Sequence, residues 1–94
     1  MEKQEMEKLI NHGEDVMLVD IREPEEYSDG LSAGKCINIP MGKMFTEAGK
    51  GNLPKDKKII LVCKSGGRCK VVTQELKERG YDIDYLEGGV SSLS

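Results

Sequence analysis

A thiol, two glycines and a guanidinium lie within one short segment of this chain. The segment reads IILVCKSGGRCK, in which an apolar run ends at Cys63 and is followed by Gly66, Gly67 and Arg68. A cysteine thiolate is a strong nucleophile, and glycines allow a turn the positive φ values with which backbone N–H groups form a cradle for an anion. Arginine can bind an oxyanion such as a sulfonate, phosphate or arsenate through two parallel hydrogen bonds. These residue types in this order predict a nucleophilic Cys63 beside an anion-binding loop.

The elements on either side of this loop strengthen the prediction. The apolar run from Lys58 to Val62 is typical of a strand buried on both faces, and Arg68 to Arg79 has apolar or small residues at helical spacing. The positive end of that helix, together with the charges of Lys64 and Arg68, should lower the pKa of Cys63. We therefore expect Cys63 at the carboxyl end of a strand, where open α/β sheets carry their working sites.

Each feature also has a purely structural interpretation. A cysteine after an apolar run can be an ordinary buried residue, and a Gly-Gly pair can be a plain strand-to-helix turn. The combination in this order is more specific, and it favours the functional interpretation. Cys69 is interpreted either as a small side chain facing the core, which we favour, or as a resolving thiol for an oxidised Cys63. Cys36 is interpreted as a core residue.

Four strands and two main helices are expected around the loop. The strands are Val16 to Asp20, Cys36 to Ile39, Lys58 to Val62 and Ile83 to Leu86, and the helices are Glu2 to His12, ended by Gly13, and Arg68 to Arg79, ended by Gly80. This alternation predicts a three-layer α/β/α domain with a small parallel sheet of four to five strands, formed by residues 1–94 as a single domain.

The remaining segments are predicted to be less regular. Pro24 is expected to open a short helical turn, and Ser28 to Lys35 is expected to be a loop. Met41 to Asp56 contains three glycines and a proline, so it is predicted to be a loop with at most one helical turn, at Lys43 to Glu47.

Composition and charge exclude several classes of function. The 94 residues carry a net charge of -3 with a pI of about 5.2, which argues against a nucleic-acid-binding protein. No segment is predicted to span a membrane or to act as an export signal, so we expect a cytoplasmic protein. Three cysteines with a single histidine, His12, favour neither a disulfide framework nor a structural metal. We therefore expect no metal and no cofactor.

At these residues the chain resembles the rhodanese-like family, whose active-site loop C-x-x-G-x-R is found here as CKSGGR, from Cys63 to Arg68. Three further segments match the family: LVDIREPEEY (Leu18 to Tyr27), INIP (Ile37 to Pro40) and LEGGV (Leu86 to Val90). The segment GLSAGKC (Gly30 to Cys36) departs from the family pattern by lacking its histidine. Leu93 occupies the position of a family tryptophan.

The resemblance implies a sulfurtransferase that works through a persulfide on Cys63. A donor such as thiosulfate would give its outer sulfur to Cys63, and a thiol or cyanide acceptor, or a sulfur-relay protein, would then receive it. The reaction that the resemblance implies needs no metal or organic cofactor. The residues expected to bind the donor or the persulfide are Lys64, Ser65, Gly66, Gly67, Arg68 and Cys69. Asp20 and Arg22 are expected to support the site as an ion pair that ties down a neighbouring turn.

Two other functions remain open at this point. One is a non-catalytic rhodanese-like module that binds a partner or senses sulfur or a small anion. The presence of both Cys63 and Arg68 favours the enzyme over this module. The other is a phosphatase or arsenate reductase, which we rank last because the loop from Cys63 to Arg68 is tight for a tetrahedral phosphoryl group.

Overall fold

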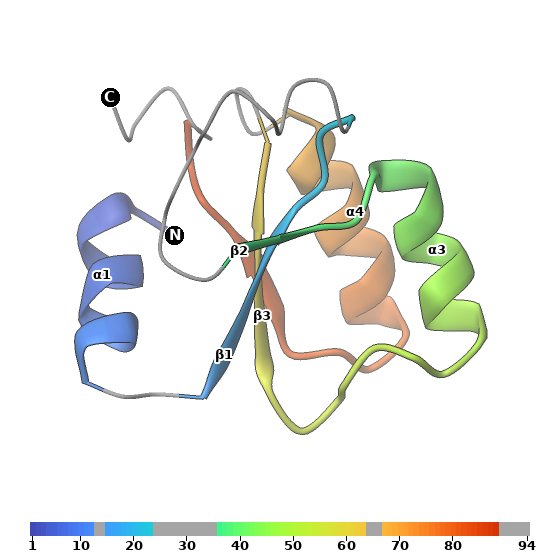
Figure 1. Cartoon of the computed structure of the whole chain (residues 1–94), viewed down its shortest axis with the longest axis horizontal. Helices are drawn as coiled ribbons and strands as arrows, with labels where there is room; N and C mark the ends of the chain where they lie inside the picture. Colours follow the sequence, from blue (N-terminus) through green and yellow to red (C-terminus); the bar gives the residue numbers. More distant parts are fainter. Residues whose placement is uncertain (13–14, 24–35, 64–66, 89–94) are drawn as a thin grey trace.

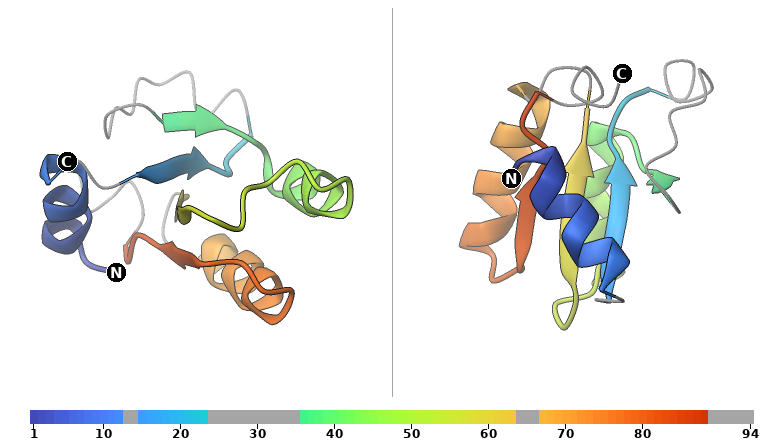
Figure 2. Two further views of the ribbon diagram at one scale, coloured as in Figure 1. Left: turned by 90° about the horizontal axis from the view of Figure 1, so that it is seen from below. Right: turned by 90° about the vertical axis from the view of Figure 1, so that its left-hand side faces the viewer.

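The computed structural model describes residues 1–12, 15–23, 36–63 and 67–88, which form a sheet between two layers of helices (Figure 1). The described elements are α1 (Lys3–Asn11), β1 (Val16–Asp20), β2 (Cys36–Asn38), α3 (Met41–Gly49), β3 (Lys58–Val62), α4 (Gly67–Glu78) and β4 (Ile83–Tyr85). Helix α1 covers one face of the sheet, and α3 and α4 cover the other (Figure 2). The predicted three-layer α/β/α arrangement is confirmed.

The four described strands are parallel and lie in the order β2-β1-β3-β4. Asp20, the last residue of β1, is in register with Val62, the last residue of β3. The carboxyl ends of the two strands therefore lie side by side at one edge of the sheet. The predicted parallel sheet is confirmed.

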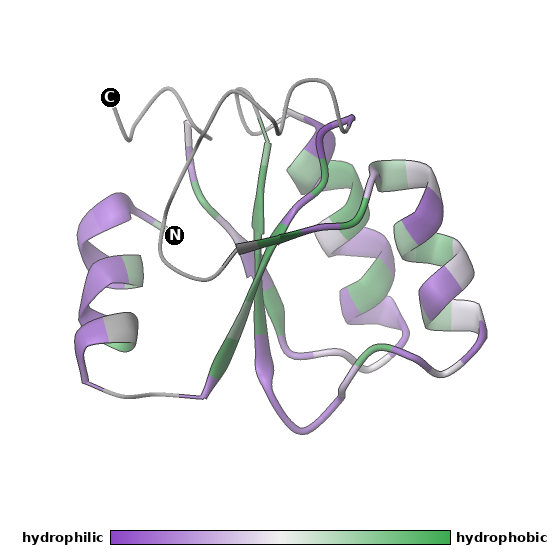
Figure 3. Ribbon diagram, in the orientation of Figure 1, coloured by the Kyte–Doolittle hydropathy of each residue, from purple (hydrophilic) through white to green (hydrophobic). Residues whose placement is uncertain are grey.

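The central strand β3 has no exposed face. Ile59 and Leu61 pack into the cluster that also contains Met44 of α3 and Leu76 of α4. Ile60 and Val62 pack into a second cluster, together with Met6 of α1 and Leu18 of β1. Alternate side chains of a strand point to opposite faces, so an unbroken apolar run is what a strand between two helical layers requires. Figure 3 shows the hydrophobic residues concentrated in the strands and the polar residues on the outer helical surfaces.

Helix α4 ends where the sequence predicts. The Gly80 N–H donates to the Lys77 carbonyl at 3.0 Å, and the Tyr81 N–H donates to the Leu76 carbonyl at 3.1 Å. This pair of bonds is the Schellman motif, which needs a left-handed residue after the helix. Gly80 supplies it with a φ of 93°, and the buried side chains of Tyr81 and Leu76 share a cluster, as this motif favours.

The prediction of a loop from Met41 to Asp56 is wrong in its first half. Residues Met41–Gly49 form the nine-residue helix α3 after Pro40. Met41, Met44, Phe45 and Ala48 recur at helical spacing and pack against the core. The three glycines of the segment led to the prediction of a loop despite the helical spacing of these apolar residues. Burial of an apolar face stabilises a helix more than the two glycines within it destabilise it.

A buried ion pair and a side-chain amide hold the end of β1. Asp20 is completely buried, and its Oδ2 lies 2.9 Å from Arg22 Nη2. Arg22 Nε donates to both carboxylate oxygens at 3.0 Å, and the Arg22 backbone N–H donates to Oδ1 at 2.9 Å. Asn38 of β2 donates from Nδ2 to the backbone carbonyls of Asp20 and Arg22, each at 2.9 Å. The turn after β1 is thus fixed by both side chains and backbone.

Several sequence predictions fall outside the described residues. These are the helix-ending role of Gly13, the helical turn at Pro24 and the loop from Ser28 to Lys35. In the part of the chain that is described, no helix is both long and apolar enough to cross a membrane.

The buried pair predicts that loss of the Asp20 carboxylate destabilises the fold strongly. In Asp20→Ala the Arg22 guanidinium keeps its charge in a buried place but loses this partner, so the free energy of unfolding should fall by about 3 kcal/mol or more. Asp82→Ala is the matched control, because Asp82 makes an exposed ion pair with Lys58 and should cost at most about 1 kcal/mol. Urea unfolding followed by circular dichroism measures both variants. Equal losses in the two variants would contradict a structural role for the buried pair.

The two glycines that border α4 should respond oppositely to substitution by alanine. Gly80 has a φ of 93°, so Gly80→Ala should lower the free energy of unfolding by about 1–2 kcal/mol. Gly67 begins α4 without a positive φ, and a Cβ built there meets no atom within 4 Å. Gly67→Ala should therefore be neutral or stabilising by up to about 1 kcal/mol. Thermal unfolding of both variants tests this, and a destabilised Gly67→Ala protein would show that Gly67 needs its conformational freedom.

Candidate functional site

Cys63 follows β3 directly and faces the helical layer of α3 and α4. It continues the alternation of Ile59 and Leu61, with which it shares a cluster, and it is completely buried. The Ile21 N–H donates to the Val62 carbonyl at 2.9 Å, so the chain that leaves β1 runs beside Cys63. The alternation of side chains along β3 therefore places the Cys63 thiol on the face covered by α3 and α4.

Cys69 lies in the first turn of α4 and is also completely buried. Its side chain is hydrogen-bonded to Cys63. This hydrogen bond and burial, followed by the charge of Cys63 and that of the Asp20 carboxylate, raise the pKa of the Cys69 thiol far above its usual range. Cys69 is thus both a core residue, as favoured from the sequence, and a direct neighbour of the predicted nucleophile.

Charges of both signs act on this pair of thiols. The Asp20 carboxylate raises the pKa of Cys69, whereas the Arg68 guanidinium opposes the rise. Arg68 is half-buried, next to Cys69 in α4. The structure therefore brings together four of the residues predicted from the sequence, namely Asp20, Cys63, Arg68 and Cys69.

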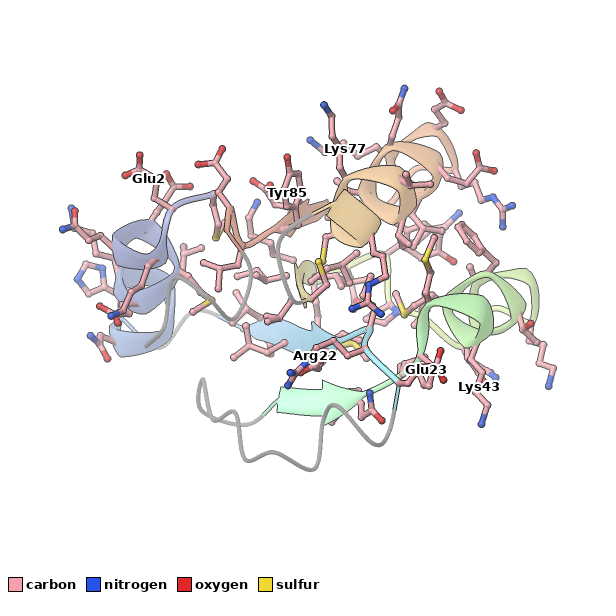
Figure 4. The ribbon with its side chains drawn as sticks, turned by 90° about the horizontal axis from the view of Figure 1, so that it is seen from above. Glu2, Arg22, Glu23, Lys43, Lys77 and Tyr85 are labelled. Atoms are coloured by element: carbon pink, nitrogen blue, oxygen red, sulfur yellow. The ribbon has the colours of Figure 1, made fainter. Side chains whose placement is uncertain are left out.

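Arg22 reaches this group through Asp20. Figure 4, which looks onto the carboxyl ends of the strands, shows Arg22 beside β1 and β2. Its guanidinium contacts the Asp20 carboxylate from the turn after β1, with only 5% of the residue exposed. The ion pair expected between Asp20 and Arg22 is present, and it lies within electrostatic reach of Cys69.

The anion cradle is described only in part. Lys64, Ser65 and Gly66 lie outside the described residues, whereas Gly67, Arg68 and Cys69 form the first turn of α4. The first N–H groups of a helix have no partner within the helix, and this first turn holds no acidic side chain. The expectation of a positive φ is wrong for Gly67, because Gly67 already belongs to the helix. Its backbone contributes to the positive end of the helix instead.

Asn38 is a site-supporting residue that the sequence did not indicate as one. Its side-chain amide donates hydrogen bonds to the backbone carbonyls of Asp20 and Arg22. These bonds hold the turn after β1 against β2. The signal that could have revealed it is its place just before Ile39 and Pro40, where β2 ends beside β1. An asparagine at a strand end can satisfy backbone carbonyls that no further strand residue reaches.

Neither a metal cluster nor the surface groove coincides with the predicted site. In residues 1–12, 15–23, 36–63 and 67–88, no three histidine, cysteine or acidic side chains are arranged to hold a metal ion. A groove of about 440 Å³ lies between α3 and α4. Its lining residues are Phe45, Val71, Gln74, Glu75 and Glu78, none of which is a predicted site residue.

The chain is similar to known proteins over nearly its whole length. The protein named "Putative sulfurtransferase YtwF" from Bacillus subtilis is 34% identical over 89 residues, which cover 90% of this chain and 80% of that protein. A tRNA uridine(34) hydroxylase from Bdellovibrio bacteriovorus is 33% identical over 92% of this chain, which spans only 25% of that longer protein. The crystal structure of a rhodanese-related protein from Thermoplasma volcanium superposes with a TM-score of 0.84 at 28% identity, covering 99% of this chain and 88% of that one.

A family model also matches the chain, and the match includes the candidate site. The model of the rhodanese-like domain matches residues 2–94, which include β3, α4 and the loop between them. Together with the relative named as a sulfurtransferase, the fold supports a sulfurtransferase activity in general terms. The chain belongs to the rhodanese-like domain family.

Proposed function

We propose that this protein transfers a sulfane sulfur from a small anionic donor to a thiophilic acceptor through a persulfide on Cys63. Thiosulfate and persulfides of small thiols are the donor class, and cyanide or a thiol is the acceptor class. The observation that carries the proposal is the position of Cys63 between the end of β3 and the N-terminus of α4, with Arg68 in the first turn of that helix.

Each group at this position has a part in the proposed reaction. The Cys63 thiolate attacks the outer sulfur of the donor, a new S–S bond forms, and sulfite or a thiolate leaves with the electron pair of the broken bond. Arg68 and the helix N-terminus attract the anionic donor and then favour the negatively charged persulfide. The acceptor attacks the outer sulfur and returns Cys63 to its thiolate.

A second candidate is a binding or sulfur-sensing module that does not turn over. The observation in its favour is that Cys63 has no exposed surface in this structure, as expected of a thiol that reacts with nothing. The enzyme stays the favoured function, because a thiol that reacts with nothing does not need Arg68 in the first turn of the adjoining helix. Measured sulfur uptake therefore decides between the two functions.

The first test measures whether Cys63 takes up sulfur. After incubation with thiosulfate, or with glutathione persulfide as an alternative donor, intact-protein mass spectrometry should show the gain of one sulfur atom, which cyanide then removes. Cys63→Ser should show no gain, because a hydroxyl group forms no persulfide. A protein that gains no sulfur from either donor would contradict the enzyme and favour the module.

The second test concerns recognition of the anionic donor by Arg68. In Arg68→Gln the KM for thiosulfate should rise about tenfold or more, because a charge-assisted pair of hydrogen bonds is lost. Arg79→Gln is the matched control, since it removes the same charge from just beyond the other end of α4, where Arg79 pairs with Glu75. Steady-state cyanolysis rates over a range of thiosulfate concentrations give both values. A similar KM in the two variants would assign donor binding to other groups.

A further inference from the structure

We propose that Cys69 is a resolving thiol: it attacks the Cys63 sulfur of the persulfide, expels the outer sulfur as hydrogen sulfide and leaves a Cys63–Cys69 disulfide. This inference rests on the proposed function, because it needs the persulfide as its starting state. It adds a second catalytic residue and a second product to the sulfur transfer.

The first support is the placement of the two sulfur atoms. Both cysteines are outside any disulfide, completely buried and part of the same cluster. The side chains of Cys63 and Cys69 are hydrogen-bonded to each other, so the two sulfurs are already neighbours before any reaction. They belong to the end of β3 and to the first turn of α4, two elements packed against one core. An attack between them needs little rearrangement of either element.

The step is balanced without an outside oxidant. Cys63–S–S⁻ and Cys69–SH become the Cys63–Cys69 disulfide and HS⁻. The bond between Cys63 Sγ and the outer sulfur breaks, and its electron pair leaves with the outer sulfur, which is reduced to sulfide. A bond forms between Cys69 Sγ and Cys63 Sγ, so Cys69 Sγ is oxidised from the thiol to the disulfide level, while Cys63 Sγ exchanges one S–S bond for another. The proton of Cys69 goes to the departing sulfide.

The surroundings of Cys69 keep on its thiol the proton that this step transfers to the outer sulfur. Hydrogen bonding to Cys63, burial and the nearby Asp20 carboxylate all favour the protonated Cys69 thiol. Cys69 thus remains a proton donor while Cys63 carries negative charge. Passing that proton to the outer sulfur improves the leaving group and creates the attacking Cys69 thiolate at the same moment, next to the positive Arg68.

Burial of both cysteines makes the internal reaction competitive with external acceptors. An acceptor from solvent has to reach the outer sulfur, whereas Cys69 is held beside the inner one. The resulting disulfide has to be reduced by a dithiol of small-molecule or protein origin before the next cycle. With such a dithiol present, the protein acts as a sulfane-sulfur reductase that releases hydrogen sulfide.

The test compares persulfide lifetime and sulfide release in the presence and absence of Cys69. All proteins carry Cys36→Ser, so that Cys63 and Cys69 are the only cysteines. Each fully reduced protein receives about one equivalent of donor, thiosulfate or glutathione persulfide, without oxygen and without added thiol. Intact mass and sulfide are followed over time, with Cys69→Ser and Cys69→Ala as the test variants. Two substitutions of different polarity are used because Cys69 lies in the core, and circular dichroism confirms that each protein is folded.

The expected result is a short-lived persulfide in the protein that retains Cys69. That protein should release about one equivalent of sulfide and end lighter than its reduced form by two hydrogen atoms. Tryptic peptide mapping should locate the disulfide between Cys63 and Cys69. Both Cys69 variants should instead accumulate the persulfide, with sulfide release slowed by about tenfold or more.

The possible failures are distinguishable. If the Cys69 variants accumulate the persulfide and the Cys69-containing protein holds it equally long without releasing sulfide, the resolving role is overturned while the proposed function stands. If no protein gains sulfur from either donor, the proposed function itself fails.

Discussion

The site depends on one constraint, which is that β3 must be buried on both faces. Ile60 and Val62 face α1, while Ile59 and Leu61 face α3 and α4. A strand has a period of two, so a shift of one residue would exchange the two faces along its whole length. Cys63 is the next residue in the row of Ile59 and Leu61, and its thiol is therefore directed toward the helix that carries Cys69 and Arg68.

A second constraint is that the neighbouring strand has to end in a fixed place. The pair of Asp20 and Arg22 is almost free of solvent contact, so its charges act in a medium that screens them weakly. Asn38 secures the same turn through two backbone carbonyls. The result is a fixed negative charge near Cys69 and a fixed end to β1. Asp20 thus holds the turn through Arg22 and also raises the pKa of the Cys69 thiol.

Sequence reasoning was most successful where local pattern and tertiary packing agree. The strand from Lys58 to Val62 and the cap at Gly80 could be predicted because an unbroken apolar run, or a glycine after a helical period, is compatible with few local structures. Helix α3 was missed because glycine content argued against a helix whose buried face only the tertiary packing reveals. Which of the two glycines belongs to the turn and which to the helix could not be predicted, because glycine is compatible with both; the structure places Gly67 in the helix.

The relation between the cysteines could be predicted only in part. Five residues lie between Cys63 and Cys69, and the sequence favoured a core role for Cys69 without showing that it contacts Cys63. A core role does not exclude a chemical one, since the same side chain fills the core and is hydrogen-bonded to Cys63. Asn38 illustrates the opposite case, because its partners are backbone carbonyls from other segments. Its place before Ile39 and Pro40 indicates a strand end but not where those carbonyls will lie.

The placement of two buried thiols side by side supports the different roles proposed for them. Two neighbouring thiols in a medium of low polarity lose the first proton far more easily than the second, because the second anion would be repelled by the first and left poorly solvated. Cys63 continues β3 toward the positive N-terminus of α4, whereas Asp20 and burial oppose ionisation of Cys69. The raised pKa keeps the proton on Cys69, as the proposed resolving step requires. The proposed nucleophile and the proposed proton donor are residues of the same type, and what distinguishes them is their positions in the fold.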